Sequence, residues 1–309
     1  MTGMPAASAS ASASSSGSAS ASASMPPAPA PAKPPVPTPV PLPDQPRVLI
    51  TGGAGGLGLA LAAAYLDRGA RVLVADLAPT RPDGVPGDAA YLTLDVRSDA
   101  DWARARDWVD GEWGGLDLLV NNAGLASGGR IDHDNIDDWQ RMFDVNLFGV
   151  ARGCRTFAPV FKAQRSGHIL NIASAAGLIH GPGMSSYNAA KAGVVALSET
   201  LGFELSPWGI GVAVACPSFF RTNLHAGFVG ADTAMQAAAV ALIDRSPLSA
   251  EEVASAIVAG LDAGEQVIVP DELARATVAM KNTDPQAYAA RSHALGQRLA
   301  GRSTAEVSS

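Results

Sequence analysis

The sequence predicts an α/β protein with one doubly wound, Rossmann-type parallel sheet of seven strands, covered by helices on both faces. Three observations support this fold class. Seven short apolar runs alternate with longer helical stretches after residue 46, and a glycine-rich turn follows the first run. The roughly 260 residues after the N-terminal segment also suit one domain of this kind. Strands joined by crossover helices pair in parallel, and ligands then lie beyond their carboxyl ends.

The predicted strands are short runs rich in Val, Leu, Ile and Ala, as is typical of strands buried on both faces. In chain order they are residues 47–51, 71–76, 91–94, 116–120, 168–173, 211–215 and 266–269. The predicted helices lie between them, at residues 57–68, 99–113, 136–164, 186–208 and 251–263. The first helix is rich in Ala and Leu and stops at Gly69, a residue type that commonly ends helices.

Composition divides the chain into three segments. Residues 1–46 hold 12 of the 22 prolines with Ala and Ser, and they carry one Lys and one Asp. We expect this segment to be a disordered tail, because it offers too little apolar surface to offset the ordering of its backbone. Residues 47–275 form the expected folded domain, and residues 276–309 a helical extension with a polar tail.

The overall composition excludes several classes of function. The net charge is -7 and no basic run exists, which argues against nucleic acid as a partner. The only two cysteines, Cys154 and Cys216, give neither a disulfide framework nor metal-ligand spacing, so we expect no metal and a reducing, cytoplasmic location. The sequence shows no secretory signal and no long uncharged apolar stretch, so no membrane association is expected.

The glycine-rich turn runs from Thr51 to Gly58 with the sequence Thr-Gly-Gly-Ala-Gly-Gly-Leu-Gly. Between a strand and a helix, such a turn lets backbone amides and the helix N-terminus approach a pyrophosphate. The second predicted strand ends in Asp76. A carboxylate there bonds ribose hydroxyls and repels a 2′-phosphate, which favours NAD over NADP. An ordinary tight turn and an ordinary strand-end acid are the alternatives.

A second group of residues follows the fifth predicted strand. Tyr187 and Lys191 are four positions apart, so on a helix they share one face. A nearby ammonium favours the phenolate, and we therefore expect Lys191 to lower the pKa of Tyr187. Ser174 follows the strand itself, where its hydroxyl could donate to a carbonyl oxygen. A packed Tyr beside an exposed Lys, and a Ser that only caps a turn, are the structural alternatives.

Together these motifs resemble the classical short-chain dehydrogenases/reductases over residues 48–270. The turn fits that family's Thr-Gly-x-x-x-Gly-x-Gly pattern, and residues 121–124 read Asn-Asn-Ala-Gly as in the family. Asn146, Ser174 and the Tyr187/Lys191 pair follow in the family's order. The resemblance implies a dinucleotide-binding catalytic domain over residues 47–275. It also implies hydride transfer between a nicotinamide and a secondary alcohol or ketone.

The resemblance also implies the roles of individual residues. Tyr187 would be the general acid/base, Lys191 would bind the nicotinamide ribose, Ser174 would polarise the substrate carbonyl, and Asn146 would hold a water that links Lys191 to solvent. The implied cofactor is NAD, with NADP less favoured. The residues expected to bind it are Gly52, Ala54, Gly55, Gly56, Leu57, Gly58, Asp76, Asp95, Val96, Asn122, Ala123, Gly124, Tyr187, Lys191, Pro217, Ser218, Phe220 and Thr222.

Two features complicate the match. The family usually has Gly after the Pro that follows the sixth strand, whereas Ser218 follows Pro217 here, although Thr222 stays in register to bond the carboxamide. Because Gly55 and Gly56 are both glycine, the turn also fits the spacing of the extended, epimerase-like subgroup. The Asn-Asn-Ala-Gly segment and the short C-terminal part favour the classical type.

The chemical character of the substrate is inferred from residues 217–247, where the family has its substrate loop. This stretch is apolar, and its only bases are Arg221, His225 and Arg245. We therefore expect a neutral, lipophilic alcohol or ketone. The expected substrate contacts are Met184, Phe219 and Phe228. Packing of the same side chains against the domain is an equally weighted alternative.

Two other functions stay open at this point. A regulator that only binds a dinucleotide would not need Asn146, Ser174, Tyr187 and Lys191 together. An epimerase or dehydratase would retain its NAD and release no NADH. The predicted helices 136–164 and 186–208 match those that pair between subunits in the family, which implies a homodimer or homotetramer.

Overall fold

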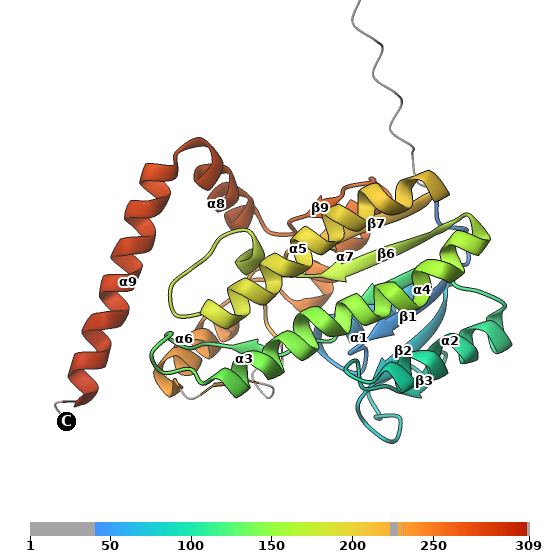
Figure 1. Ribbon diagram of the computed structural model, residues 1–309, viewed down its shortest axis with the longest axis horizontal. Helices are drawn as coiled ribbons and strands as arrows, with labels where there is room; N and C mark the ends of the chain where they lie inside the picture. Colours follow the sequence, from blue (N-terminus) through green and yellow to red (C-terminus); the bar gives the residue numbers. More distant parts are fainter. Residues whose placement is uncertain (1–40, 223–227, 231, 308–309) are drawn as a thin grey trace, which may run out of the picture. The chain divides into compact units, whose positions relative to one another are not determined.

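The computed structural model describes residues 41–222, 228–230 and 232–307 (Figure 1). Seven parallel strands form the central sheet in the order β3-β2-β1-β4-β6-β7-β9. Their bounds are β1 (Arg47–Thr51), β2 (Arg71–Asp76), β3 (Ala90–Thr93), β4 (Leu118–Asn121), β6 (Gly167–Ile172), β7 (Ile210–Ala215) and β9 (Val267–Ile268). The predicted doubly wound parallel sheet is confirmed. The strand order reverses between β1 and β4, and that reversal opens a crevice at the carboxyl ends of these two strands.

Helices cover both faces of the sheet because successive residues of each strand point to opposite sides. Val48 and Ile50 pack in one buried cluster with α1 (Gly56–Asp67) and α7 (Ala250–Asp262). Leu49, between them, belongs to a second cluster. This second cluster is completed by α2 (Asp99–Trp113), α4 (Val150–Gln164) and α5 (Ser185–Leu205). Figure 1 shows α4 and α5 running side by side over this face.

The long helix predicted at residues 136–164 is three consecutive pieces. These are α3 (Ile136–Phe143), the π-helical turn η1 (Asp144–Gly149) and α4. The helix predicted at 186–208 is α5 followed by the 3-10 turn η3 (Ser206–Trp208). A π-helical turn inside an α-helix is rare and frequently marks a functional site.

The structure also contains elements that the sequence patterns did not predict. A small parallel pair joins β5 (Ala126–Ser127) to β8 (Phe228–Val229). A short 3-10 turn, η2 (Ala175–Gly177), follows β6. Later in the chain, α6 (Thr233–Asp244) lies in the segment where the family has its substrate loop and helix, and α8 (Glu272–Thr283) follows β9. Helix α9 (Pro285–Val307) lies within the helical extension predicted for residues 276–309. The predicted domain boundary between residues 275 and 276 therefore falls inside α8.

The expected N-terminal tail lies mostly outside the described residues, which begin at Pro41. Within the described part, Leu42 already packs against the cluster formed by β1, α1 and α7. In the part of the chain that the structure describes, no helix has the length and apolar character needed to cross a membrane.

Candidate active site

The glycine-rich turn between β1 and α1 has a backbone conformation and packing that require glycine at several positions. Gly52 and Gly56 have φ values of 62° and 52°, in the left-handed region that favours glycine. A Cβ at Gly58 would lie 2.2 Å from the carbonyl oxygen of Gly52, so only glycine lets α1 approach the turn. Gly55 faces open space, and among the described residues no side chain caps the start of α1. The first amides of α1 are therefore free to bind an anion.

The Asn-Asn-Ala-Gly segment after β4 is tied directly to this turn. The Asn122 side-chain amide donates to the carbonyl oxygens of Thr51 and Gly52 at 2.9 and 3.0 Å. In return, Thr51 Oγ1 accepts hydrogen bonds from the backbone amides of Asn122 and Ala123. These bonds fix the two walls of the crevice relative to each other.

Two carboxylates lie at one end of the crevice. Asp76, at the end of β2, accepts hydrogen bonds from the backbone amides of Ala54 and Leu77 at 2.9 and 2.7 Å. Asp95 forms an ion pair with Arg97, with 2.6 Å between Oδ2 and Nη2. The hydrogen bonds from Arg97 hold the pKa of the Asp95 carboxyl below its usual value. Among the described residues, Asp76 therefore has no ion-pair partner, whereas the charge of Asp95 is neutralised by Arg97.

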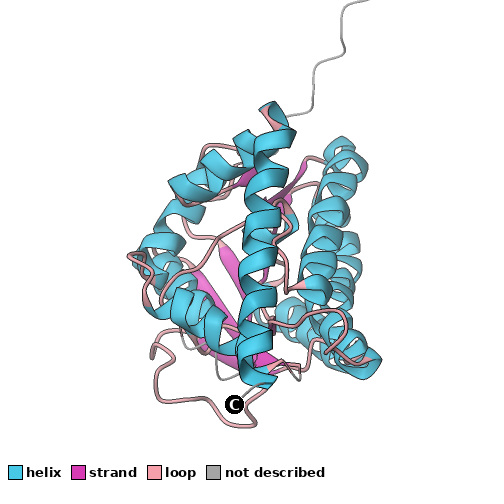
Figure 2. Cartoon of the chain, turned by 90° about the vertical axis from the view of Figure 1, so that its left-hand side faces the viewer, coloured by secondary structure: helices cyan, strands magenta, loops and turns pink. Residues whose placement is uncertain are grey.

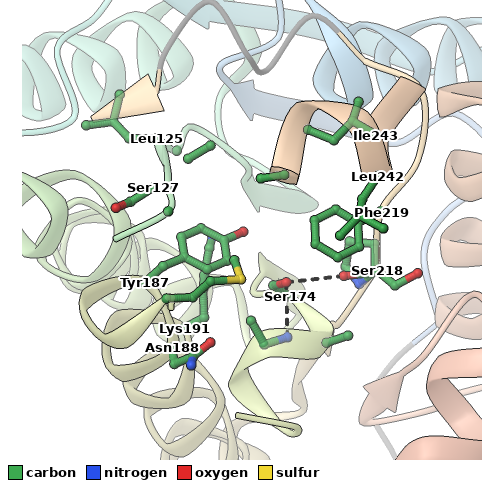
Figure 3. Close-up of a pocket in the computed structure, with 18 of the residues that line it drawn as sticks. Leu125, Ser127, Ser174, Tyr187, Asn188, Lys191, Ser218, Phe219, Leu242 and Ile243 are labelled. Atoms are coloured by element: carbon green, nitrogen blue, oxygen red, sulfur yellow. Dashed lines mark hydrogen bonds between the residues drawn. The ribbon is translucent and has the colours of Figure 1, made fainter. Parts of the chain in front are cut away.

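Tyr187 and Lys191 occupy one face of the first turns of α5, as predicted (Figure 3). Lys191 is buried, its ammonium donates to the carbonyl oxygen of Ile172 at 2.9 Å, and it lies 5.8 Å from the centre of the Tyr187 ring. Burial lowers the pKa of Lys191 to about 8. An exposed Lys, the structural alternative for this pair, is therefore excluded.

The expected lowering of the pKa of Tyr187 is not found. Burial raises this pKa, because water no longer solvates the phenolate, and the nearby Ser174 hydroxyl only partly opposes the rise. The nearby Lys191 does not reverse the direction. In this state the phenol of Tyr187 holds its proton.

Ser174 lies at the carboxyl end of β6, in the same cavity as Tyr187 (Figure 3). Its Oγ accepts a hydrogen bond from the Ala176 amide at 3.2 Å and donates to the carbonyl oxygen of Pro217 at 3.3 Å. Ser174 thus caps η2, and it lines the same cavity as Tyr187. The capping role and a place beside Tyr187 are compatible.

Asn146 lies in the π-helical turn η1 and is fully buried. Its side chain accepts from the Leu125 amide at 2.7 Å and donates to the Leu125 carbonyl at 2.9 Å. A Cβ at Gly124 would lie 3.2 Å from Asn146 Oδ1 and 3.6 Å from Lys191 Nζ, so the three residues meet at one point. The role of Asn146 toward a bound water stays a prediction.

The segment after β7 lies across the crevice from the glycine-rich turn. The amide of Ser218 donates to Asp271 Oδ2 at 3.3 Å, and the same aspartate caps α8. A Cβ at Gly56 would lie 2.6 Å from Thr222 Oγ1, so Thr222 closes on the start of α1. Replacement of the family's usual Gly by Ser218 is accommodated in this arrangement.

One cavity of about 1300 Å³ joins nearly all the predicted residues. Those that line it are Gly52, Gly55, Gly56, Leu57, Asp76, Asp95, Val96, Asn122, Ala123, Gly124, Ser174, Met184, Tyr187, Lys191, Pro217, Ser218, Phe219, Phe220, Thr222 and Phe228. The predicted site residues that do not line the cavity are Ala54, Gly58 and Asn146. Arg221 also points elsewhere, donating to the carbonyl oxygens of Ser246 and Pro247, and His225 lies outside the described residues.

The sequence patterns missed the part of the cavity wall that α6 and α9 supply. Helix α6 contributes Ala238, Leu242 and Ile243, and α9 contributes a stripe that includes Tyr288 and Leu295. The stripe on α9 repeats at three to four residues, which is a helical signal, but nothing in that spacing indicates what the helix covers. Among the described residues, no group of His, Cys, Asp and Glu side chains could hold a metal ion.

Comparison with known proteins identifies what this arrangement is similar to. Residues 46–232, more than half of the chain, match the sequence profile of the family described as short chain dehydrogenase. The 3-alpha-(or 20-beta)-hydroxysteroid dehydrogenase of Mycobacterium tuberculosis is 36% identical over 165 residues, which cover 52% of this chain and 64% of that protein. The trans-4-hydroxycyclohexanecarboxylate dehydrogenase of Sinomonas cyclohexanicum is 33% identical over 172 residues, covering 52% and 66%.

These alignments span slightly less than two thirds of the curated relatives' own length. A solved structure extends the similarity. It is a short chain dehydrogenase/reductase from Burkholderia phymatum in complex with NAD, with 28% identity and a TM-score of 0.74. The match covers 79% of this chain and 95% of that protein.

Proposed function

The chain belongs to the short chain dehydrogenase family, a family of oxidoreductases that bind a nicotinamide dinucleotide. From this premise we propose that it is an NAD-dependent dehydrogenase or reductase acting on a secondary alcohol or ketone. The observation that carries the proposal is the placement of Ser174, Tyr187 and Lys191 around one cavity with the uncapped start of α1. A protein that only bound a dinucleotide would not need Ser174, Tyr187 and Lys191 together in this cavity.

The cavity fits a dinucleotide along its length. The free amides at Gly55–Leu57 would hold the pyrophosphate, and Asp76 would hold the adenosine ribose. Lys191 and Thr222 would hold the nicotinamide end. When bound, the nicotinamide ring supplies or accepts the hydride. The Asp76 carboxylate favours NAD, since it would repel a 2′-phosphate at that place.

The residues of the chain would handle the proton. In reduction, the phenol of Tyr187 would give its proton to the substrate oxygen as the carbonyl carbon gains hydride, and in oxidation it would take that proton back. Ser174 would donate a hydrogen bond to the same oxygen. Because burial favours the neutral phenol, release of the Tyr187 proton needs a cation close by, and the Lys191 ammonium is the candidate.

The substrate is proposed to have a lipophilic body. Phe219, Leu242 and Ile243 line the same cavity as Ser174 (Figure 3), and Met184 and Phe228 line it as well. The two dehydrogenases named above have a hydroxysteroid and a hydroxycyclohexanecarboxylate in their names, which are cyclic secondary alcohols. The expectation of a neutral substrate rested on the bases of residues 217–247 alone. Helix α9 adds Arg291 and Arg298 to the bases that line the cavity.

Tyr187→Phe tests the proposed chemistry. The variant lacks the proton that must be exchanged, so turnover should fall by about a hundredfold or more while NADH affinity stays unchanged. Tyr65→Phe is a matched control, since the Tyr65 hydroxyl is buried on α1 without a hydrogen-bond partner among the described residues. Turnover would be followed as NADH formed from a panel of cyclic and aliphatic secondary alcohols. Undiminished turnover in Tyr187→Phe would exclude the assignment. Product formed without net NADH would favour an epimerase or dehydratase.

A homodimer or homotetramer and a cytoplasmic location belong to the same proposal. Phe148 and Phe203, which are 48% and 75% exposed, lie on the long helical segments that pair between subunits in the family. The thiols of Cys154 and Cys216 are both free and buried, which suits a reducing compartment. Sedimentation-velocity analysis of the wild type and of Phe203→Glu would test the assembly. A monomeric wild type would exclude it.

A further inference from the structure

The cavity is lined by acids and by bases from different parts of the chain. Asp76 and Asp95 line it next to β2, where Arg97 is already paired with Asp95. The other bases that line it are Arg141 on α3, Arg245 after α6, and Arg291 and Arg298, both on α9. In the part of the chain that the structure describes, neither Arg291 nor Arg298 forms an ion pair or a side-chain hydrogen bond.

Several contacts fix α9 at the substrate end of the cavity. The Tyr288 hydroxyl accepts a hydrogen bond from the His180 amide at 3.0 Å. Lys281, on the neighbouring α8, donates to the carbonyl oxygen of Leu178. A Cβ at Gly183 would lie 3.5 Å from Leu299 Cδ1. All three partners belong to the loop between Ser174 and Tyr187. Figure 2, viewed from this side, shows the C-terminal helix standing in front of the sheet.

The face that α9 turns to the cavity is both apolar and cationic. Its lining residues are Tyr288, Arg291, Ser292, Leu295, Arg298 and Leu299, at the spacing of one helical face. Residues 285–300 include no Asp or Glu. The third acid that lines the cavity, Asp271, accepts the amides of Ser218 and Ala274. Among the described residues, none of the acids that line the cavity forms an ion pair with Arg291 or Arg298.

We propose that the substrate carries an anionic group, a carboxylate or a phosphate, at the end remote from the reacting carbon. Arg291 and Arg298 bind this group, and Leu295 and Leu299 pack against the apolar body. The inference rests on the proposed function for the reacting end and adds the charge of the substrate. An unpaired guanidinium beside apolar surface suits such an amphiphilic anion, because its planar donors match carboxylate and phosphate oxygens. Both arginines are exposed, so each contact contributes modestly.

Direct binding measurements test the charge of the ligand separately from catalysis. The probes are octanoate, octyl phosphate and octan-1-ol, which share one apolar chain and differ in the head group. Each is titrated calorimetrically into the full-length protein, without cofactor and again with saturating NADH. Octanoate or octyl phosphate should bind at least about tenfold more tightly than octan-1-ol, and this preference should shrink as salt is added. The stronger of the two anions identifies the head group.

The double variant Arg291→Gln/Arg298→Gln should lose that preference while its affinity for octan-1-ol stays unchanged. Arg291→Lys/Arg298→Lys keeps the charge and should restore part of the preference, which a merely structural role of the arginines would not do. Arg106→Gln is the control, since it removes one exposed charge from α2, away from the cavity. An equal affinity for all three probes in the wild type, or an unchanged preference in the Gln double variant, overturns the inference. Absence of NADH binding would instead count against the proposed function.

Discussion

Lys191 carries a charge that is unfavourable to bury, and its spacing from Tyr187 did not indicate whether it would be buried or exposed. It is buried, and its ammonium donates to the Ile172 carbonyl oxygen. Among the residues that the structure describes, no carboxylate pairs with it. A charge buried in this way destabilises the fold unless other groups compensate. Its retention in the interior is therefore better explained by a role in the reaction than by a role in stability.

Lys191→Met should stabilise the free protein at pH 7 by about 2 kcal/mol, after the loss of the hydrogen bond to Ile172 is counted. The pKa of Lys191 falls from 10.5 to about 8 on folding. Between these two values the unfolded chain binds more protons than the native protein, so the stability of the wild type rises with pH across that window. The variant lacks this rise, and the two proteins should converge near pH 10. Urea unfolding at pH 7 and pH 10 measures both values. Equal stabilities at pH 7 would contradict the prediction.

Asp76→Asn tests the proposed choice of cofactor. The asparagine keeps the size of the side chain and one acceptor for the Ala54 or Leu77 amide, but it removes the negative charge. The ratio of NADPH to NADH affinity should therefore rise by about tenfold or more, because the repulsion of a 2′-phosphate is lost. Fluorescence titration with both cofactors gives the ratio. Asp83→Asn, a change in the loop between β2 and β3, serves as the control. An unchanged ratio would mean that other residues select the cofactor.

At the scale of elements, glycines in the turn between β1 and α1 serve two different purposes, close packing and an open cavity wall. Gly58 is needed by the fold, since a Cβ there would collide with the carbonyl oxygen of Gly52. Gly55 has an extended backbone that any residue adopts, and a Cβ there would meet nothing within 4 Å. The open space beside Gly55 belongs to the cavity.

Gly55→Ala and Gly58→Ala should consequently differ in what they damage. Gly58→Ala should lower the free energy of unfolding by about 2 kcal/mol or more, because backbone atoms must move. Gly55→Ala should leave stability unchanged or slightly improved, yet weaken NADH binding by about tenfold, because its methyl group would occupy the path proposed for the pyrophosphate. Thermal unfolding and NADH titration of the two variants separate these effects. Tight NADH binding by Gly55→Ala would show that the pyrophosphate lies elsewhere.

The sequence predicted those elements whose pattern is local. The strands at residues 47–51 and 71–76 and the helix at 99–113 have the predicted bounds, because their apolar runs and stop signals lie within the element itself. The π-helical turn around Asn146 was not predicted, since one extra residue in a helical turn leaves the apolar pattern nearly intact. The pair β5–β8 was missed for another reason. It joins residues about 100 positions apart through two-residue strands, which are too short to show a period.

At the scale of the whole molecule, the candidate site combines parts that the sequence could and could not predict. Ser174 and Asp76 follow strand ends, so the parallel topology alone brings them to one edge of the sheet. The wall supplied by α9 depends on how α8 and α9 return to the loop before α5, through contacts such as Tyr288 to His180. No local pattern encodes that path. The sequence therefore could not predict that the arginines on α9 line the cavity, and only the structure showed it.

The compositional border near residue 46 does not coincide with the start of the packed part of the chain, which already includes Leu42. All candidate catalytic and cofactor residues lie after Thr51, so a chain that begins at Pro41 and one that begins at Gln45 should both bind NADH like the full-length protein. They should differ in stability. Leu42 packs against the cluster formed by β1, α1 and α7, and its removal should cost about 1 kcal/mol of unfolding free energy. Thermal and urea unfolding of the three chains would show this. Impaired NADH binding by the chain that begins at Pro41 would mean that residues 1–40 contribute to the site, and equal stability of the two shortened chains would mean that the Leu42 contact is not stabilising.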